Sequence, residues 1–292
     1  MNTNRPLQWL IPPILLLALA AALAGLWPAA GQPYPMTSFR GEPVTINARG
    51  LYYWDTASSA AQMQANDLVT LLLGLPLLVV SFRLAQRDSL RGRLLLSGTL
   101  GYFLYTYMSM CFGTAFNPLF LVYVALFGLS LYAFVISMLG YDLAALPRRF
   151  SERLPRRAIA GLLFFAAGFL GLAWLGRIAS STFGAAVPAL ENTTSMFIQA
   201  MDLALIVPLC VLGGTLLMRR SAWGYLLASV GLMKFLTMST AVSLMTLNMA
   251  RAGAAISPVE LVIFPGMCLA NLALAIALLR SIDPLAESAA AA

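Results

Sequence analysis

The chain has 292 residues, of which 60% are hydrophobic and only 10% are charged, and its formal net charge is +7. A soluble protein of this size cannot bury so much apolar surface, so the composition indicates a chain whose solvent is the lipid bilayer. Histidine is absent, which excludes imidazole as a metal ligand, general base or pH switch. The 3 cysteines lie far apart within apolar runs, so we expect neither a metal site nor a disulfide framework.

Eight apolar segments are each close to the roughly 20 residues that a helix needs to cross a bilayer. Near the end of the first segment, Ala22-Leu23-Ala24 also fits the cleavage site of a secretory signal, and cleavage would leave seven spans. We expect a retained helix instead, because the apolar run continues to Trp27. The predicted spans are 9–27, 68–84, 94–115, 119–139, 158–178, 197–218, 223–249 and 259–280.

Residues 28–66 form the longest loop and have a strand-like composition in two places. Residues 43–47 and 51–54 are separated by a turn-like Asn-Ala-Arg-Gly sequence, so we predict a short hairpin on the outer side of the membrane. Tyr52, Tyr53 and Trp54 suit an aromatic belt at the membrane interface. The alternative is a cap over an outward-facing cavity.

Arginines alternate between successive loops. They cluster after the second, fourth, sixth and eighth spans, whereas the opposite loops carry few. By the positive-inside rule, both termini are cytoplasmic, as expected for a multi-pass protein of a bacterial inner membrane. The positive net charge then reflects topology, and we expect no nucleic-acid partner. The clustered arginines are Arg83, Arg87, Arg91, Arg93, Arg148, Arg149, Arg153, Arg156, Arg157, Arg219, Arg220 and Arg280.

A sequence motif occurs twice, about 135 residues apart. Gln-Ala-Asn-Asp-Leu at 64–68 matches Gln-Ala-Met-Asp-Leu at 199–203, and each is followed by a proline, arginines and a second apolar run. Aligning Gly92 with Gly224 extends the match and pairs Tyr102 with Lys234. Recurrence of polar landmarks in one order indicates a tandem duplication.

The duplication predicts an all-α membrane protein with eight transmembrane helices in two parallel four-helix repeats. Because each repeat has an even number of spans, the two must be related by an axis along the membrane normal. We assign 1–139 to the first repeat, with its outer loop at 28–66, and 158–292 to the second. Residues 140–157 form an arginine-rich cytoplasmic linker between them.

Lys234 is the residue that most strongly indicates a functional site. It lies eleven residues into the seventh span, about 17 Å deep and near the middle of a bilayer core of roughly 30 Å. An ammonium there costs at least about 2.5–3.5 kcal/mol, so it must be paired, neutral or facing water. Asp202 lies at a reachable height on the sixth span, and we predict an ion pair between them. A pair with a purely structural role is the alternative.

Asp67 holds the place in the first repeat that Asp202 holds in the second. Each aspartate also fits a simpler role, in which it complements the positive end of a helix dipole. Tyr102 and Tyr105 lie on one polar face of the third span, which belongs against protein or a wet cavity. The predicted substrate-binding residues are therefore Lys234, Asp202, Tyr102, Asp67 and Tyr105.

The leading hypothesis for function is a small transporter or permease with a midplane site between the repeats for an anionic or zwitterionic solute. One alternative is a structural or assembly subunit that packs against a membrane-protein partner or another copy of the chain. A second is a membrane-embedded enzyme that acts on lipid at the outer surface through Asp55, Asp67 or Glu191. The chain has no recognisable catalytic or cofactor-binding motif, so we expect no cofactor and rank the enzyme last.

Overall fold

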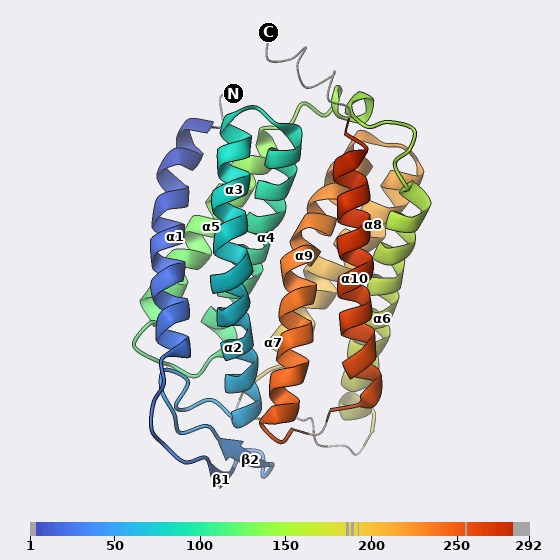
Figure 1. Ribbon diagram of the computed structural model, residues 1–292. Helices are drawn as coiled ribbons and strands as arrows, with labels where there is room; N and C mark the ends of the chain where they lie inside the picture. Colours follow the sequence, from blue (N-terminus) through green and yellow to red (C-terminus); the bar gives the residue numbers. More distant parts are fainter. Residues whose placement is uncertain (1–3, 185–186, 188–189, 192, 255, 283–292) are drawn as a thin grey trace.

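The computed structural model describes residues 4–184, 187, 190–191, 193–254 and 256–282, most of which are helical. Long helices run side by side, and a two-stranded sheet lies at one end of the bundle (Figure 1). The elements are α1 (Asn4–Leu26), β1 (Tyr34–Thr37), β2 (Pro43–Ile46), α2 (Ala57–Val69), η1 (Thr70–Gly74), α3 (Leu75–Gln86), α4 (Leu90–Gly113), α5 (Phe120–Leu139), η2 (Leu146–Arg149), α6 (Arg156–Thr182), α7 (Phe197–Met201), η3 (Asp202–Ile206), α8 (Val207–Met218), α9 (Ala222–Arg251) and α10 (Pro258–Arg280).

The described chain contains 7 helices that are long and apolar enough to cross a membrane. The third predicted span, 94–115, forms α4 but is not among them, because glycines and polar side chains dilute its apolar residues. Most of α4 is buried against other helices, where such residues are tolerated. The protein is thus an all-helical, multi-pass membrane protein. The seven are Arg5–Leu26, Ala57–Gln86, Phe120–Leu139, Arg156–Thr182, Phe197–Met218, Ala222–Arg251 and Pro258–Arg280.

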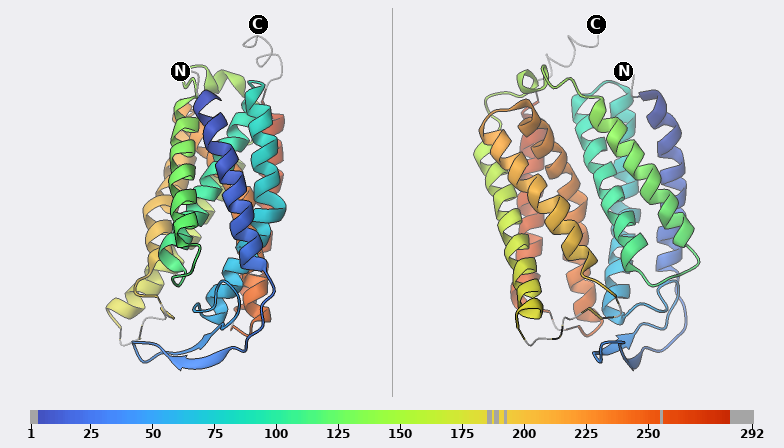
Figure 2. Two further views of the ribbon diagram at one scale, coloured as in Figure 1. Left: turned by 90° about the vertical axis from the view of Figure 1, so that its left-hand side faces the viewer. Right: turned by 180° about the vertical axis from the view of Figure 1, so that it is seen from behind.

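The helices form two groups that stand side by side (Figures 1 and 2). We call α1 to α5 the N-terminal group and α6 to α10 the C-terminal group. They meet mainly where α4 and α2 pack against α9. The first helix begins and the last helix ends at the same end of the bundle, and the sheet lies at the opposite end. The final residues of the predicted second repeat, 283–292, lie outside the described residues.

Close backbone contact joins the two groups. A Cβ atom at Gly98 of α4 would overlap the Cβ of Met233 and lie 2.7 Å from the backbone nitrogen of Lys234, so only glycine fits. Nearer the sheet, the Asn248 amide of α9 donates to the carbonyl of Ala61 in α2 at 2.7 Å. Small residues that let helices approach, supplemented by occasional polar contacts, are the usual means of helix association in lipid.

Each group contains a π-helical turn directly before a proline. Turn η1 precedes Pro76 and turn η3 precedes Pro208. In a regular α-helix, proline leaves one carbonyl without its donor and clashes with the residue four positions earlier. A wider π turn relieves that clash, and such turns are frequent at functional sites. The second and sixth predicted spans therefore continue past their prolines, and Asp202 itself begins η3.

The turn between α3 and α4 and the turn between α8 and α9 have the same construction. Asp88 and Arg220 both adopt a left-handed conformation, with φ of 56° and 55°, and a serine follows each as the residue that caps the next helix. Three residues later comes a glycine, Gly92 or Gly224, whose added Cβ would overlap the end of the preceding helix. Both turns are thus tight because the helices touch at a glycine.

The outer loop forms a hairpin, but not the predicted one, because the segment 43–47 pairs with the chain before it and not with 51–54. β2 (Pro43–Ile46) pairs antiparallel with β1 (Tyr34–Thr37), whereas 51–54 form a turn. The Asn47 side chain donates to the carbonyls of Arg49 and Tyr52, each at 2.9 Å, and Ala48 has a positive φ of 55°. These contacts curl the chain inward, so Tyr52 is only 1% exposed and does not belong to an aromatic belt.

The segment between the groups is tied to the end of α10. The Ser151 amide donates to the carbonyl of Ser281 at 2.8 Å, and Phe150 forms an isolated antiparallel bridge with Ile282. Arg91 at the start of α4 donates to the carbonyls of Leu279 and Ile282. One end of the bundle therefore gathers the connecting segment, the start of α4 and the end of α10.

Candidate functional site

The carboxylate of Asp202 is held by two donors from different helices. It is 7% exposed, and it accepts a hydrogen bond from the Tyr105 hydroxyl at 2.6 Å and one from the Trp174 indole nitrogen at 2.8 Å. Tyr105 comes from α4 and Trp174 from α6. Asp202 in η3 therefore connects α4 of the N-terminal group with α6 of the C-terminal group.

Lys234 lies beside this carboxylate without forming the ion pair that the sequence predicted. Its ammonium lies 4.3 Å from the centre of the Tyr105 ring and 5.3 Å from that of Phe235. Among the described residues, no oxygen of Asp202 comes within 4.0 Å of the Lys234 nitrogen. The predicted direct pair was wrong because Tyr105 binds the carboxylate with its hydroxyl and the ammonium with its ring face.

There is open space at Gly231, one helical turn from Lys234 on α9. Gly231 is buried, yet a Cβ atom at Gly231 would meet nothing within 4 Å. The stem of the lysine passes Gly101 of α4, where an added Cβ would be 3.7 Å from its Cγ. The amine is thus packed along its stem and less crowded on the Gly231 side.

The other two predicted site residues lie elsewhere, in the N-terminal group. Asp67 is 1% exposed and accepts a 2.6 Å hydrogen bond from the Tyr52 hydroxyl. A Cβ atom at Gly25 of α1 would overlap its carboxylate, so α1 closes over it. Tyr102 is fully buried, and its hydroxyl contacts Thr70 at 2.8 Å and the Asn66 amide oxygen at 3.0 Å.

The five predicted residues therefore separate into two clusters. Lys234, Asp202 and Tyr105 lie together, with Trp174, which the sequence analysis missed; we call these four the interface cluster. Asp67 and Tyr102 belong to a second group of buried polar and aromatic side chains. Phe103 packs edge-on against Tyr102 and stacks on Tyr107, which in turn stacks on Tyr123. With Tyr52 as the partner of Asp67, these six form the N-terminal cluster.

An acidic group lies at the sheet end of the bundle. Thr56 donates to the Glu191 carboxylate, and the Glu191 amide donates to Glu42 at 3.1 Å. Asp55 next to Thr56 accepts hydrogen bonds from the Ala115 amide and the Ser59 hydroxyl on one oxygen, and its second oxygen finds no partner in the described part of the chain. Burial, opposed by these two hydrogen bonds, raises the pKa of Asp55 from its ordinary value of 3.8 to about 6.

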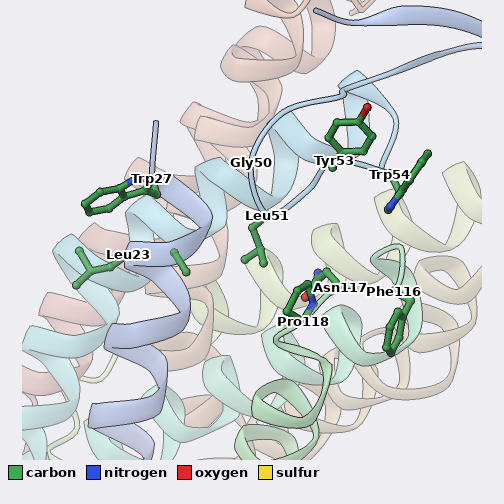
Figure 3. A pocket seen from close by; sticks show the side chains of 10 residues that line it. Leu23, Trp27, Gly50, Leu51, Tyr53, Trp54, Phe116, Asn117 and Pro118 are labelled. Atoms are coloured by element: carbon green, nitrogen blue, oxygen red, sulfur yellow. The ribbon is translucent and has the colours of Figure 1, made fainter. Parts of the chain in front are cut away.

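A cleft of about 840 Å³ opens at the same end, between the end of α1 and the start of α5 (Figure 3). Its lining is apolar and aromatic, and none of these side chains carries a charge. The segment that forms one wall also contains Tyr52, so the cleft and the N-terminal cluster share a stretch of chain. The lining residues are Leu23, Ala24, Trp27, Gly50, Leu51, Tyr53, Trp54, Phe116, Asn117 and Pro118.

The described residues contain no group of three His, Cys, Asp or Glu side chains arranged to hold a metal ion. Cys111, Cys210 and Cys268 are free thiols. No protein-family model matches the chain, and comparison with curated proteins and with solved structures gives no significant match. Function must therefore be argued from the clusters themselves.

Proposed function

We propose that the protein is a small permease whose solute-binding site is the interface cluster. The observation that carries this proposal is the meeting of a buried lysine and a buried aspartate at the contact between two helix groups, separated by Tyr105. Ionisable side chains inside a membrane are costly and usually belong to substrate or ion pathways. A site between two helix groups is also where many transporters bind their solutes.

The two groups are proposed to be parallel four-helix repeats, at 1–139 and 158–292, joined by 140–157. Three local features support this duplication: the π turn before proline, the left-handed residue before a capping serine, and the glycine contact that follows. In this proposal α4 is the eighth span, shielded from lipid by its neighbours. Movement of one group against the other at α4 and α9 would then expose the site alternately to each side.

The proposed orientation places both termini in the cytoplasm of a bacterial cell. The arginine-rich segments gather at the end of the bundle that holds the start of α1 and the end of α10. In a background without the three native cysteines, single cysteines replacing Ser89 and Ser151 should resist an impermeant maleimide in intact cells, whereas Thr37→Cys should react. Reaction at the first two and not at the third would reverse the orientation.

Transport by the purified protein in liposomes is the direct test. Radiolabelled small anions and zwitterions should enter protein-containing vesicles faster than empty ones, with saturation. Lys234→Met should bring uptake down to the level of empty vesicles, because the cation that attracts the solute is gone. Asp142→Asn, which removes an exposed acid in the segment between the groups, is the matched control and should transport normally. Equal uptake by wild type and Lys234→Met would refute the proposed site.

The enzyme alternative has one specific observation in its favour, the acidic group of Glu42, Asp55 and Glu191 at the outer end. Asp67, which the sequence analysis included, is not part of it. A carboxyl with a raised pKa suits general acid–base chemistry. Phospholipid vesicles incubated with the protein, followed by mass spectrometry of the lipids, would reveal a product that is lost in Asp55→Asn and retained in Lys234→Met if this alternative holds.

A further inference from the structure

The two charged side chains of the interface cluster differ in their hydrogen-bond partners. Both carboxylate oxygens of Asp202 already accept hydrogen bonds, one from Tyr105 and one from Trp174. The ammonium of Lys234 can donate three hydrogen bonds. It faces the rings of Tyr105 and Phe235 and reaches no hydrogen-bond acceptor among the described residues.

An acceptor is therefore what this site lacks. Lys234 is 6% exposed, and contact with ring faces compensates for only part of its lost hydration. The free space beside the buried Gly231 lies one turn away on the same helix. A small ligand that supplies a negatively charged oxygen would complete the coordination of the ammonium.

We propose that the site binds a small monoanion, such as a monocarboxylate, together with one proton that Asp202 takes up. This inference rests on the proposed function, because it names the substrate class and coupling of the same site. A zwitterion fits less well, because its ammonium would enter a site that already holds the ammonium of Lys234. A simple cation is excluded by the proximity of Lys234.

Charge balance explains why a proton should bind together with the anion. With Lys234 protonated and Asp202 ionised, the empty cluster is neutral, and a bound monoanion would leave a net negative charge in a buried site. A hydronium ion transfers its proton to Oδ1 of Asp202, so one O–H bond breaks in the hydronium as one forms on the carboxylate, neutral water leaves, and the site is neutral again. That O–H can donate to the Tyr105 oxygen, which frees the Tyr105 hydrogen for the anion, while Trp174 still donates to Oδ2.

The groups that face the cluster from the neighbouring helices leave Asp202 as the proton acceptor. Tyr105 faces it from α4, Trp174 from α6 and Lys234 from α9. The Cys210 thiol of α8 is also close enough to interact with both charges. A neutral thiol and a neutral phenol carry no negative charge for a proton to cancel, whereas the Asp202 carboxylate does.

Binding to the purified protein in detergent tests the inference without any transport step. In a variant that keeps Trp174 as its sole tryptophan, acetate, propionate and benzoate should change the fluorescence with saturation, whereas glycine and betaine should not. A pH indicator in weakly buffered solution should report uptake of one proton per bound anion. The replaced tryptophans are Trp9, Trp27, Trp54 and Trp223, each changed to phenylalanine.

Two substitutions separate anion binding from proton uptake. Lys234→Met should weaken anion binding at least about thirty-fold, because a charged hydrogen-bond donor is lost. Asp202→Asn imitates the protonated acid, so it should bind the anion at least as well as wild type but without taking up a proton. Asp67→Asn, in the N-terminal cluster, is the matched control. It should bind the anion with wild-type affinity and take up one proton per bound anion.

Each outcome bears on one claim. Saturable binding of zwitterions in preference to monoanions would overturn the substrate class, even if transport occurs. Anion binding without proton uptake by the wild type, or uptake that persists in Asp202→Asn, would overturn the coupling. If no monoanion binds even at about 100 mM, which is roughly 100 times a typical upper KM, the inference as a whole is overturned. Binding with the expected proton but without transport in liposomes would instead refute the permease proposal.

Discussion

The two buried aspartates hold matching places in the sequence but have different surroundings. Asp67 accepts its hydrogen bond from Tyr52, which belongs to the same helix group, and α1 closes over it at Gly25. Asp202 accepts one hydrogen bond from across the contact between the groups and lies near a buried cation. A carboxylate held within one group keeps its partners whatever the relative position of the groups, whereas one that bridges two groups would change its partners if the groups moved apart.

The residues that α4 and α9 carry at aligned positions account for the different surroundings of Asp67 and Asp202. The sequence alignment pairs Tyr102 with Lys234, and Tyr102 uses its hydroxyl to contact Thr70 and Asn66 within its own group. At the aligned position, Lys234 carries a charge that no described side chain of its own group neutralises by direct contact. The exchange of tyrosine for lysine thus distinguishes a packed polar core from a candidate binding site.

The largest expected effect comes from exchanging each aspartate for asparagine. In liposomes with an acidic exterior, the wild type should accumulate a monocarboxylate, because each anion enters with a proton. Asp202→Asn should reduce this accumulation to the level of empty vesicles, because asparagine takes up no proton. Asp67→Asn should retain it within about two-fold. If Asp67→Asn abolishes accumulation as well, the two aspartates do not differ in role.

The contact between the groups provides the second test. In Gly98→Val, the new side chain would collide with the backbone of α9 at Lys234, so the free energy of unfolding should fall by about 3 kcal/mol. Gly128→Ala on α5, where an added Cβ meets nothing within 4 Å, should be neutral or slightly stabilising. Unfolding in mixed micelles measures both. Equal stability of the two variants would mean that α4 and α9 separate at no cost.

Much of the interface cluster was predictable from the sequence. Intramembrane charges are rare, so the cost of burial alone selected Lys234 and Asp202, and the polar face of the third span selected Tyr105. Trp174 was missed because it lies four residues before the end of the predicted span 158–178, at the level where a lipid-facing tryptophan is also expected. Neither its spacing nor its level in the membrane distinguished it from an interfacial residue.

The direct pairing and the role of Tyr52 were not predictable from spacing. Helix geometry gave the heights of Lys234 and Asp202 but not the rotation of their helices, which decides whether Tyr105 comes between them. Tyr52 looked like one of three interfacial aromatics, yet the turn closed by Asn47 directs it inward while Tyr53 and Trp54 stay exposed. Such a turn depends on side-chain contacts that hydrophobic periodicity does not register.

The stability of the protein should depend on pH through Asp55, at the sheet end of the N-terminal group. Asp55 has a pKa of about 6 when folded against 3.8 ordinarily, so between pH 4 and pH 6 the folded protein holds a proton that the unfolded chain releases. Its contribution to stability is therefore complete below about pH 4 and is lost as the pH rises through 6. The loss should amount to about 2–3 kcal/mol.

Asp55→Asn isolates this contribution. Asparagine can still accept the hydrogen bonds from Ala115 and Ser59 but does not titrate, so the free energy of unfolding should vary less between pH 4 and pH 6 than in the wild type. Glu191 is the charged neighbour that raises the pKa of Asp55 further, so Glu191→Gln should reduce the slope slightly. The same pH slope in the wild type and Asp55→Asn would contradict the assignment.

The smallest expected effect concerns the hydrogen bond between Tyr52 and Asp67. A double-mutant cycle of Tyr52→Phe and Asp67→Ala, measured as free energies of unfolding, should give a coupling energy of about 1.5 kcal/mol, because each single change removes the buried hydrogen bond to the carboxyl group. The parallel cycle of Tyr105→Phe and Asp202→Ala should give a smaller value, since Trp174 still donates to the second oxygen of Asp202 when Tyr105 is replaced. A larger coupling at Asp202 than at Asp67 would indicate that the interface cluster, rather than the N-terminal cluster, is the more rigid of the two. Its carboxylate would then be poorly suited to exchange partners as a solute and a proton bind.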